Sequence, residues 1–304
     1  MVQPYRTVMT KKRLFALIDG GVGCGIGESY CSWIRVRRRL SSPISTIFVS
    51  HTPLYRYRSL HLLSTGEERA SRIATWLGAT EIREQMPMWP GEHEHPLTGW
   101  DIDRDAFLPP LRGMLEIAHD LGIKHGVYPG TDIPFVATTD LMIRHGTPPK
   151  DRLALWQCKP ATQRQSPRSR RVVQRLALEE RYAIEAGAFS KIMYSDSLPE
   201  RFHENLLWLE PLRSEIEAFG RSNQLIDFAH EFMRLANSDS IEVCRIKAAK
   251  KTGLDLEYSH TFFRMAAWGG LIDIDLTQPI YMNKMLNRSS EAFRDRLRRE
   301  LLDA

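Results

Sequence analysis

The chain has 304 residues, 42% of them hydrophobic, which is enough for one large domain or two ordinary ones, and we expect two. Lys and Arg (42) outnumber Asp and Glu (37), which permits an acidic partner without requiring one. No stretch approaches the roughly 18 consecutive apolar residues of a membrane span, and the first residues lack a signal-peptide core. The composition therefore predicts a soluble protein whose four cysteines, which lack paired zinc spacing, are reduced cytosolic thiols.

A glycine-rich segment, GGVGCGIGESY from Gly20 to Tyr30, is the first distinctive feature of the chain. Alternating glycines also occur in dinucleotide-binding turns, but the spacing here is not G-x-G-x-x-G, and no Gly-Lys-Ser or Gly-Lys-Thr follows. No strand–loop–helix unit is predicted around the segment. We therefore expect a flexible loop and no nucleotide site.

Helix signals begin at Ser64 or Thr65, either of which can cap a helix, and the apolar residues that follow at helical spacing would form one buried face. Gly78 is expected to end this helix. Glu67 would lie in the first turn, where a carboxylate complements the positive end of the helix dipole, and this structural role is one explanation for it. Residues 79–89 then show the features of a strand.

Two further strands carry polar residues where strands are usually apolar. In FVATTDLMIRHG, Asp140 falls in the middle of a strand, where a carboxylate usually needs a partner or a metal to tolerate burial. The turn HGTPPKD then reverses the chain into RLALWQCKPA, in which Gln157 and Lys159 share one face while Trp156 and Cys158 face away. A hairpin of this kind would bring Asp140, Gln157 and Lys159 together.

An acidic helix residue, a strand aspartate and a lysine on the paired strand form the working set of metal-dependent nucleases with a restriction-enzyme-like core. Glu67, Asp140 and Gln157, together with the carbonyl of Cys158, are candidate ligands for Mg²⁺, which prefers oxygen ligands, and Mn²⁺ can substitute. Lys159 is a compact cation that can orient the attacking water and offset charge at phosphorus. The usual motif has an acidic residue two places before the lysine, so Gln157 removes one negative charge from the site.

A helical stretch at 111–121, a long basic helix at 168–187 and a strand at 188–196 are predicted to complete the first domain. We place this domain at residues 1–196. The sheet and helices together predict an α/β nuclease domain.

Residues 197–304 are predicted to form a mainly α, winged-helix-like domain, with a helix–turn–helix around Gly253 and a wing at 271–283. The presumed recognition segment, 255–268, is neither strongly basic nor rich in amides, so docking of a protein is at least as plausible as DNA binding. The tail carries apolar residues at i+4 spacing, and it is predicted either to lie in a partner's groove or to pack on its own domain. These residues are Phe293, Leu297 and Leu301.

Arginines cluster in three groups within the first 175 residues. Such runs are usually solvated surface, but three in one part of the chain favour a polyanionic partner. We predict that the first and third groups contact DNA phosphates. The groups are Arg35, Arg37, Arg38 and Arg39; Arg56 and Arg58; and Arg164, Arg168, Arg170, Arg171 and Arg175.

The chain resembles the TnsA family, the endonuclease subunit of bacterial cut-and-paste transposons that also use a TnsB transposase and a TnsC ATPase. The most specific matches are HLLSTGE, EIREQMPMWP, GIKHGVYPGTD leading into TTDLMI, and WQCKPA, with LEERYAIEAG and ENLLWL in support. By this resemblance Glu67, Asp140, Gln157 and Lys159 fall on the family's catalytic glutamate, aspartate, glutamine and lysine. Glu67 is preferred to its neighbour Glu68 because it directly follows the LLSTG entry to the helix.

The resemblance implies a restriction-endonuclease-like catalytic domain followed by a C-terminal domain that contacts the ATPase. It implies Mg²⁺-dependent cutting of the 5′ ends of transposon DNA, while TnsB makes the 3′ breaks, in the bacterial cytoplasm at the nucleoid and without a membrane. Two alternatives stay open. One is a stand-alone restriction or repair nuclease, and the other is a non-catalytic DNA-binding or assembly protein whose polar strand residues are structural.

Overall fold

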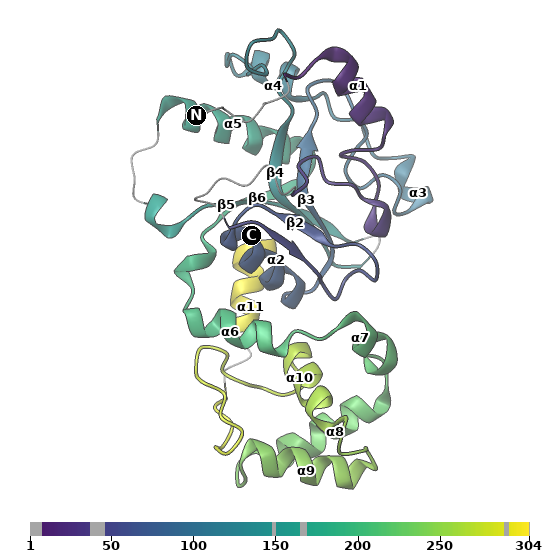
Figure 1. The fold of residues 1–304 in the computed structure, drawn as a ribbon, viewed down its shortest axis with the longest axis vertical. Helices are drawn as coiled ribbons and strands as arrows, with labels where there is room; N and C mark the ends of the chain where they lie inside the picture. The colour runs from purple at the N-terminus through teal and green to yellow at the C-terminus, as the bar shows by residue number, and fades with distance from the viewer. Residues whose placement is uncertain (1–7, 37–45, 148–149, 165–168, 289–291, 304) are drawn as a thin grey trace, which may run out of the picture.

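The computed structural model describes residues 8–36, 46–147, 150–164, 169–288 and 292–303. A mixed four-stranded sheet lies between helices, and a mostly helical group of segments extends away from it (Figure 1). The α/β class predicted from the sequence is therefore confirmed. Among the helices of the described residues, none is both long and apolar enough to cross a membrane.

The central sheet has the strand order β3–β4–β5–β6. β3, β4 and β5 pair antiparallel, whereas β6 pairs parallel with β5 and follows it through helix α5. The four strands predicted for the first domain are all present, with the bounds β3 Ala79–Met88, β4 Ala137–His145, β5 Arg152–Cys158 and β6 Ala188–Met193. A separate two-stranded sheet pairs β1 Phe48–Ser50 with β2 Leu60–Leu62.

Helices cover both faces of the central sheet, and the alternation of its side chains decides which face each one meets. Leu141 of β4 and Trp156 of β5 pack toward α2, in the same apolar cluster as Cys158. Met142 and Leu155 point the other way, toward α4 and α5. The bounds of these helices are α2 Thr65–Trp76, α4 Met114–Asp120 and α5 Arg170–Glu185.

Helix α2 begins and ends as the sequence predicts. The backbone N–H of Glu67 donates to Ser64 Oγ at 3.1 Å, so Ser64 is the N-cap. Gly78 follows the last turn with φ of 98°, a left-handed conformation that favours glycine. The capping interaction places Glu67 at the third position of the helix, directly beside the sheet.

The other elements of the first half are short: α1 Lys11–Asp19, α3 Ile102–Asp105, and 3₁₀ turns at Gly27–Ser29, Ala161–Gln163 and Ser195–Ser197. The glycine-rich segment expected to be a loop therefore contains one 3₁₀ turn. Glu28 in this turn accepts hydrogen bonds from the backbone N–H groups of Tyr57 and Arg58 at 3.2 and 3.0 Å. These contacts tie the segment to the chain that leads into β2.

After the turn at 195–197 the chain is helical, and Figure 1 shows these helices extending away from the sheet. Their bounds are α6 Glu200–Leu209, α7 Arg213–Phe219, α8 Asn223–Leu235, α9 Ile241–Thr252 and α10 Ser259–Gly269. α9 ends at Gly253, with φ of 67°, and α10 follows after a short turn. The helix–turn–helix order predicted around Gly253 is therefore present.

The wing predicted at 271–283 does not form a strand pair, since residues 271–288, all of them described, contain no strand. Ile272 and Ile274 do alternate into the core as the sequence pattern indicates. The backbone that follows forms hydrogen bonds with α9: the N–H of Ile241 at the start of α9 donates to the carbonyl of Lys284 at 2.9 Å. No second strand is therefore available to complete a wing.

The C-terminal tail forms α11 (Ala292–Arg298) and a π-helical turn (Arg299–Asp303), and it returns to the sheet beside α2 (Figure 1). Leu297, Leu301 and Leu302 are buried there. The indole Nε1 of Trp156 in β5 donates to the carbonyl of Leu301 at 2.8 Å. The tail therefore packs on the chain itself, but it reaches beyond its own predicted domain, residues 197–304, to the sheet of the first domain.

One apolar core crosses residue 196, where the sequence analysis places a domain boundary. Phe202 of α6 meets Trp76 of α2 edge-on, with ring centroids 5.6 Å apart, and it meets Phe293 of the tail at 5.7 Å. The division into residues 1–196 and 197–304 stays a prediction. The shared core means that the two parts stabilise each other.

Candidate active site

Glu67 is buried against the sheet, with only 5% of its surface exposed. Its Oε2 accepts from the backbone N–H of Leu63 at 2.8 Å and from the Nε2 of Gln85 at 3.3 Å, and its Oε1 accepts from Ser64 Oγ at 3.3 Å. A carboxylate that only complements a helix dipole would lie in solvent, where it keeps its hydration. Complementing the helix dipole, the role that the local sequence suggests, therefore does not explain why Glu67 is buried.

Asp140 and Lys159 meet where β4 and β5 separate. The ladder between these strands ends at the pair Leu141 and Trp156. Beyond it, Asp140 Oδ2 accepts from the backbone N–H of Cys158 at 2.8 Å and from Lys159 Nζ at 3.4 Å. At this point the backbone N–H of β5 donates to a side-chain carboxylate and not to a backbone carbonyl of β4. Because Asp140 and Lys159 keep 20% and 27% of their side-chain surface exposed, solvent or a ligand can reach the pair.

Gln157 lies on the other face of β5, as its alternation with Trp156 predicts, and it meets a residue of helix α5. Its amide nitrogen donates to the carboxylate of Glu179. Its Oε1 is buried and has no hydrogen-bond partner among the described residues. A buried amide oxygen without a partner is costly, and a cation is one group that would satisfy it.

Glu179 belongs to the candidate site although it was not among the residues predicted for it. The signal was present, because Glu179 occupies the buried face of α5 together with Leu178, Tyr182 and Ala183. An acidic residue on the apolar side of an amphipathic helix is unusual and needs a partner. The segment LEERYAIEAG carries part of the family resemblance, which by itself gives this glutamate no chemical role.

Burial disfavours the ionisation of two carboxyl groups of the site, those of Glu67 and Glu179. Burial, and then the charge of Asp140, raise the pKa of Glu67 from 4.5 to about 7. Burial also raises the pKa of Glu179 to about 7, where Arg175 opposes the shift and Asp140 adds to it. Glu67 and Glu179 are therefore each repelled by the charge of Asp140, and a cation bound beside Asp140 would relieve this repulsion.

The donors present are those that a hard divalent cation uses, namely carboxylate, amide and carbonyl oxygens. Within the described ranges, no three His, Cys, Asp or Glu side chains are grouped closely enough to hold a metal by themselves. The predicted ligand set contains two carboxylates, Glu67 and Asp140, with Gln157 as a neutral third member, and it stays a prediction. The partnerless Oε1 of Gln157 fits that assignment.

Neutralising Glu67 is expected to stabilise the metal-free protein at alkaline pH. Because the pKa of Glu67 is higher in the folded protein (about 7) than its ordinary value of 4.5, its contribution to stability is lost as the pH rises through 7. Glu67→Gln should therefore raise the free energy of unfolding at pH 8 by up to about 3 kcal/mol, and the gain should shrink toward pH 5. Thermal unfolding with a chelator at pH 5 to 8 measures this.

Glu28→Gln is the matched control of opposite sign. Although burial opposes it, hydrogen bonds from the backbone of Arg56, Tyr57 and Arg58 lower the pKa of Glu28. Its contribution is present above the ordinary pKa and lost as the pH falls, so this substitution should destabilise at pH 8. A Glu67→Gln variant that is less stable than the wild type at pH 8 would contradict the repulsion inferred at the site.

The arginine groups differ in what they can bind. Arg58 is buried in an ion pair with Glu84, so it is not available to a phosphate, and Arg56 pairs with Glu217 at 3.3 Å. Arg37, Arg38, Arg39 and Arg168 lie outside the described residues. Six described members are exposed, namely Arg35, Arg56, Arg164, Arg170, Arg171 and Arg175. Among them, Arg175 lies 3.4 Å from the carboxylate of Glu179 and so reaches the site itself.

Comparison with known proteins supports one family. No family model matches the chain. The chain is 27% identical over 270 residues to the transposition protein TnsA of transposon Tn7 from Escherichia coli, a match that covers 88% of this chain and 87% of that protein. The match spans almost the full length of both chains, and so includes the helix, the hairpin and α5 that build the site. This similarity, over nearly the whole of both chains, supports the resemblance to the TnsA family.

Proposed function

We propose that the chain is a Mg²⁺-dependent DNA endonuclease that cuts the 5′ ends of a transposon, acting with a TnsB transposase and a TnsC ATPase. The observation that carries the proposal is the Asp140–Lys159 pair, 3.4 Å apart at the point where two strands separate, with the buried Glu67 in electrostatic contact. The similarity to a Tn7 transposition protein supports the same activity. The catalytic domain is proposed to be restriction-endonuclease-like and the C-terminal part to dock TnsC.

Glu67, Asp140 and Gln157, with the carbonyl of Cys158, would hold the metal. Bound there, Mg²⁺ would supply Lewis-acid stabilisation of charge on the scissile phosphate. Lys159 is held beside Asp140 by a second hydrogen bond, from its Nζ to the carbonyl of Cys158 at 3.2 Å. From that position its ammonium can donate to a phosphate oxygen and offset the charge that develops while water attacks phosphorus in line.

Glu179 contributes indirectly, through Gln157. The hydrogen bond from the Gln157 amide nitrogen to the Glu179 carboxylate fixes the amide so that its Oε1 remains for another ligand. Arg175 offsets part of the Glu179 charge. Helix α5 therefore sets the orientation of the neutral ligand that replaces the usual acidic residue.

A strand-specific cleavage assay tests the function. The purified chain is incubated with Mg²⁺ and end-labelled transposon-end DNA, with and without the TnsB and TnsC of the same transposon. We expect 5′-strand cuts only when the partners are present. Cutting of plain DNA by the chain alone would favour a stand-alone restriction or repair nuclease. Assembly and TnsB cutting without any 5′ cut would favour a non-catalytic assembly protein.

The exposed arginines around α5 are expected to contact phosphates. Each contact releases counterions and contributes about 0.9 to the slope of log affinity against log salt. Arg164→Ala, Arg170→Ala and Arg171→Ala combined should therefore weaken DNA binding and reduce that slope by about 2 to 3. Fluorescence anisotropy at several salt concentrations measures the slope.

Arg201→Ala is a matched control for this triple substitution, because Arg201 is half exposed and pairs only with Glu204 on its own helix, α6. It should leave the slope unchanged. An unchanged slope in the triple variant would show that the α5 arginines are ordinary surface.

A further inference from the structure

Gln85 has an unusual backbone conformation for a residue within a strand. Its φ is 48°, and it is the one residue other than glycine with positive φ among the described residues. The ladder between β3 and β4 pairs Glu84 with Leu141 and Met86 with Thr139, and it leaves out the position between them, where Gln85 faces Asp140. Glycine would adopt this conformation without strain. The presence of a glutamine indicates that its side chain is needed.

The Gln85 side chain is buried and joins two elements of the candidate site. Its Nε2 donates to Glu67 Oε2 at 3.3 Å, and its Oε1 accepts from Thr138 Oγ1 at 3.0 Å. The threonine hydroxyl thus holds the amide with its nitrogen toward the carboxylate. Through this one amide, the first turn of α2 is connected to β4 two residues before Asp140.

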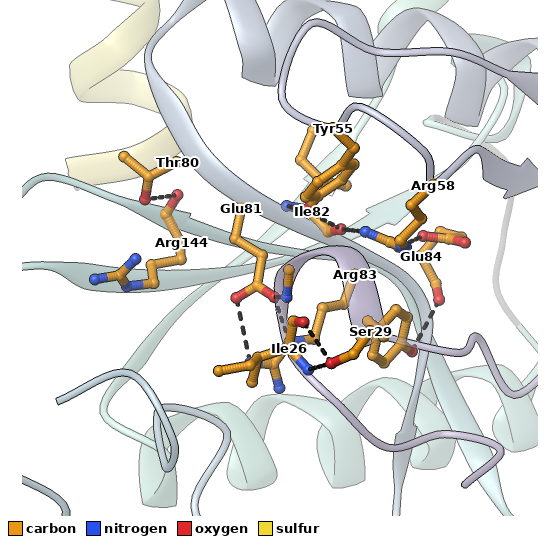
Figure 2. A network of polar contacts seen from close by, with 12 residues as sticks. Ile26, Ser29, Tyr55, Arg58, Thr80, Glu81, Ile82, Arg83, Glu84 and Arg144 are labelled. Atoms are coloured by element: carbon orange, nitrogen blue, oxygen red, sulfur yellow. Dashed lines mark hydrogen bonds and ion pairs between the residues drawn. The ribbon is translucent and has the colours of Figure 1, made fainter. Parts of the chain in front are cut away.

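The residues around Gln85 hold the strained backbone in place. The carbonyl of Gln85 accepts from the backbone N–H of Trp33 at 3.4 Å. Its neighbour Glu84 is anchored at both ends, since its carbonyl accepts from the Tyr30 hydroxyl at 3.1 Å and its carboxylate pairs with Arg58. Figure 2 shows Arg58 reaching from beside Tyr55 to Glu84.

The same segment of β3 is anchored once more at Ile82. Its carbonyl accepts from Tyr55 and from Arg58, both at 2.9 Å (Figure 2). Backbone strain persists where the surroundings over-determine it, and such residues cluster at functional sites. The N-terminal segments before α2 therefore support one strained position of β3, Gln85, whose φ is positive.

We propose that Gln85 is a positioning residue for Glu67. Together with the backbone N–H of Leu63 it holds Oε2 toward the buried side, so that Oε1, which accepts from Ser64 Oγ at 3.3 Å, is the oxygen that can reach a divalent cation. This inference rests on the proposed metal-dependent function. The inference also gives the N-terminal segment a role. Residues 30–33 and 55–58 hold β3 in the conformation that directs the Gln85 amide toward Glu67. Gln85 is proposed to act through Glu67, with which its amide forms a hydrogen bond.

The test compares divalent-cation binding with stability in the full chain. Gln85→Met keeps the length of the side chain and removes both hydrogen bonds. Mn²⁺ affinity, measured by electron paramagnetic resonance, should fall about 10- to 100-fold, as is typical when an outer-shell partner of a metal ligand is lost. Asp140→Asn, which removes a proposed ligand, should lower it further.

Thr80→Val is the matched structural control. Thr80 lies on the same strand, and its hydroxyl donates to the carbonyl of Arg144 at 3.1 Å, away from the site. This variant should lose stability and keep its Mn²⁺ affinity. Equal affinity in Gln85→Met and Thr80→Val would overturn the inference and leave Gln85 as a structural residue.

Thr138→Val covers the case in which Gln85→Met does not fold. It keeps the glutamine and removes only the hydroxyl that orients it, so Mn²⁺ affinity should fall several-fold, and an unchanged affinity would overturn the inference. Failure of the proposed function has a different signature. Wild-type protein whose Mn²⁺ binding is absent, or is unaffected by Asp140→Asn, would remove the metal site and the role of Gln85 with it.

Discussion

Asp140→Asn and Lys159→Met should each abolish 5′-end cutting while the protein stays folded. Both side chains are partly exposed, and their loss leaves no cavity in either apolar cluster. Removing a preorganised charge from a catalytic site usually costs about 100-fold or more in rate. Strand-specific cleavage of labelled transposon ends, together with thermal unfolding of the same samples, measures both effects.

Asp151→Asn is the matched control for these substitutions. Asp151 is also a carboxylate of the sheet region, but it is buried between Arg144 and Arg104 at the far end of the β4–β5 hairpin. Its loss should reduce stability, because two guanidinium groups lose their partner, and should leave cutting intact at temperatures where the protein is folded. Normal 5′ cutting by Asp140→Asn would rule out the assigned site.

Removal of the tail after Arg288 is the second large effect, and we expect the shortened chain to unfold or aggregate at 37 °C. The tail buries Leu297, Leu301 and Leu302, each of which contributes about 1.5–3 kcal/mol when fully buried. Their sum is comparable to the whole stability of an ordinary domain. In addition, the buried indole of Trp156 loses its acceptor. Circular dichroism and size-exclusion chromatography would detect the loss.

A single substitution in the tail separates the loss of buried leucine from the other consequences of removing the tail. Leu301→Ala should lower stability by about 2–5 kcal/mol. Arg299→Ala, at an exposed tail position, should have little effect. If the shortened chain unfolds at the same temperature as the full chain, the tail does not contribute to the stability of the fold.

The shared core also changes how TnsC docking is to be tested. A chain ending near Asp196 would lose Phe202 and Leu206, which pack in the same cluster as Trp76 and Ile73 of α2. Loss of TnsC binding by such a chain would then report misfolding as readily as a lost surface. Substitutions of exposed residues after 196 in the full chain avoid this problem.

Local sequence determined the elements that build the site. Ser64 and Gly78 bound α2 because capping and left-handed glycine depend on neighbouring residues only. Strand alternation put Trp156 and Cys158 in the α2 core and Gln157 on the opposite face, since the period of two is a local property. The Asp140–Lys159 pair followed from the hairpin, which brings nearby segments together.

Tertiary structure decided what depends on partners distant in the chain. Gln85 gains its role from Glu67 and Thr138, and Glu179 from Gln157, although the sequence identified neither residue as part of a site. The predicted wing failed because its backbone bonds to α9, and the amphipathic tail found its partner in the protein's own sheet. Periodicity tells which face of a segment is apolar, but only the packed chain tells what covers that face and which buried polar groups must meet.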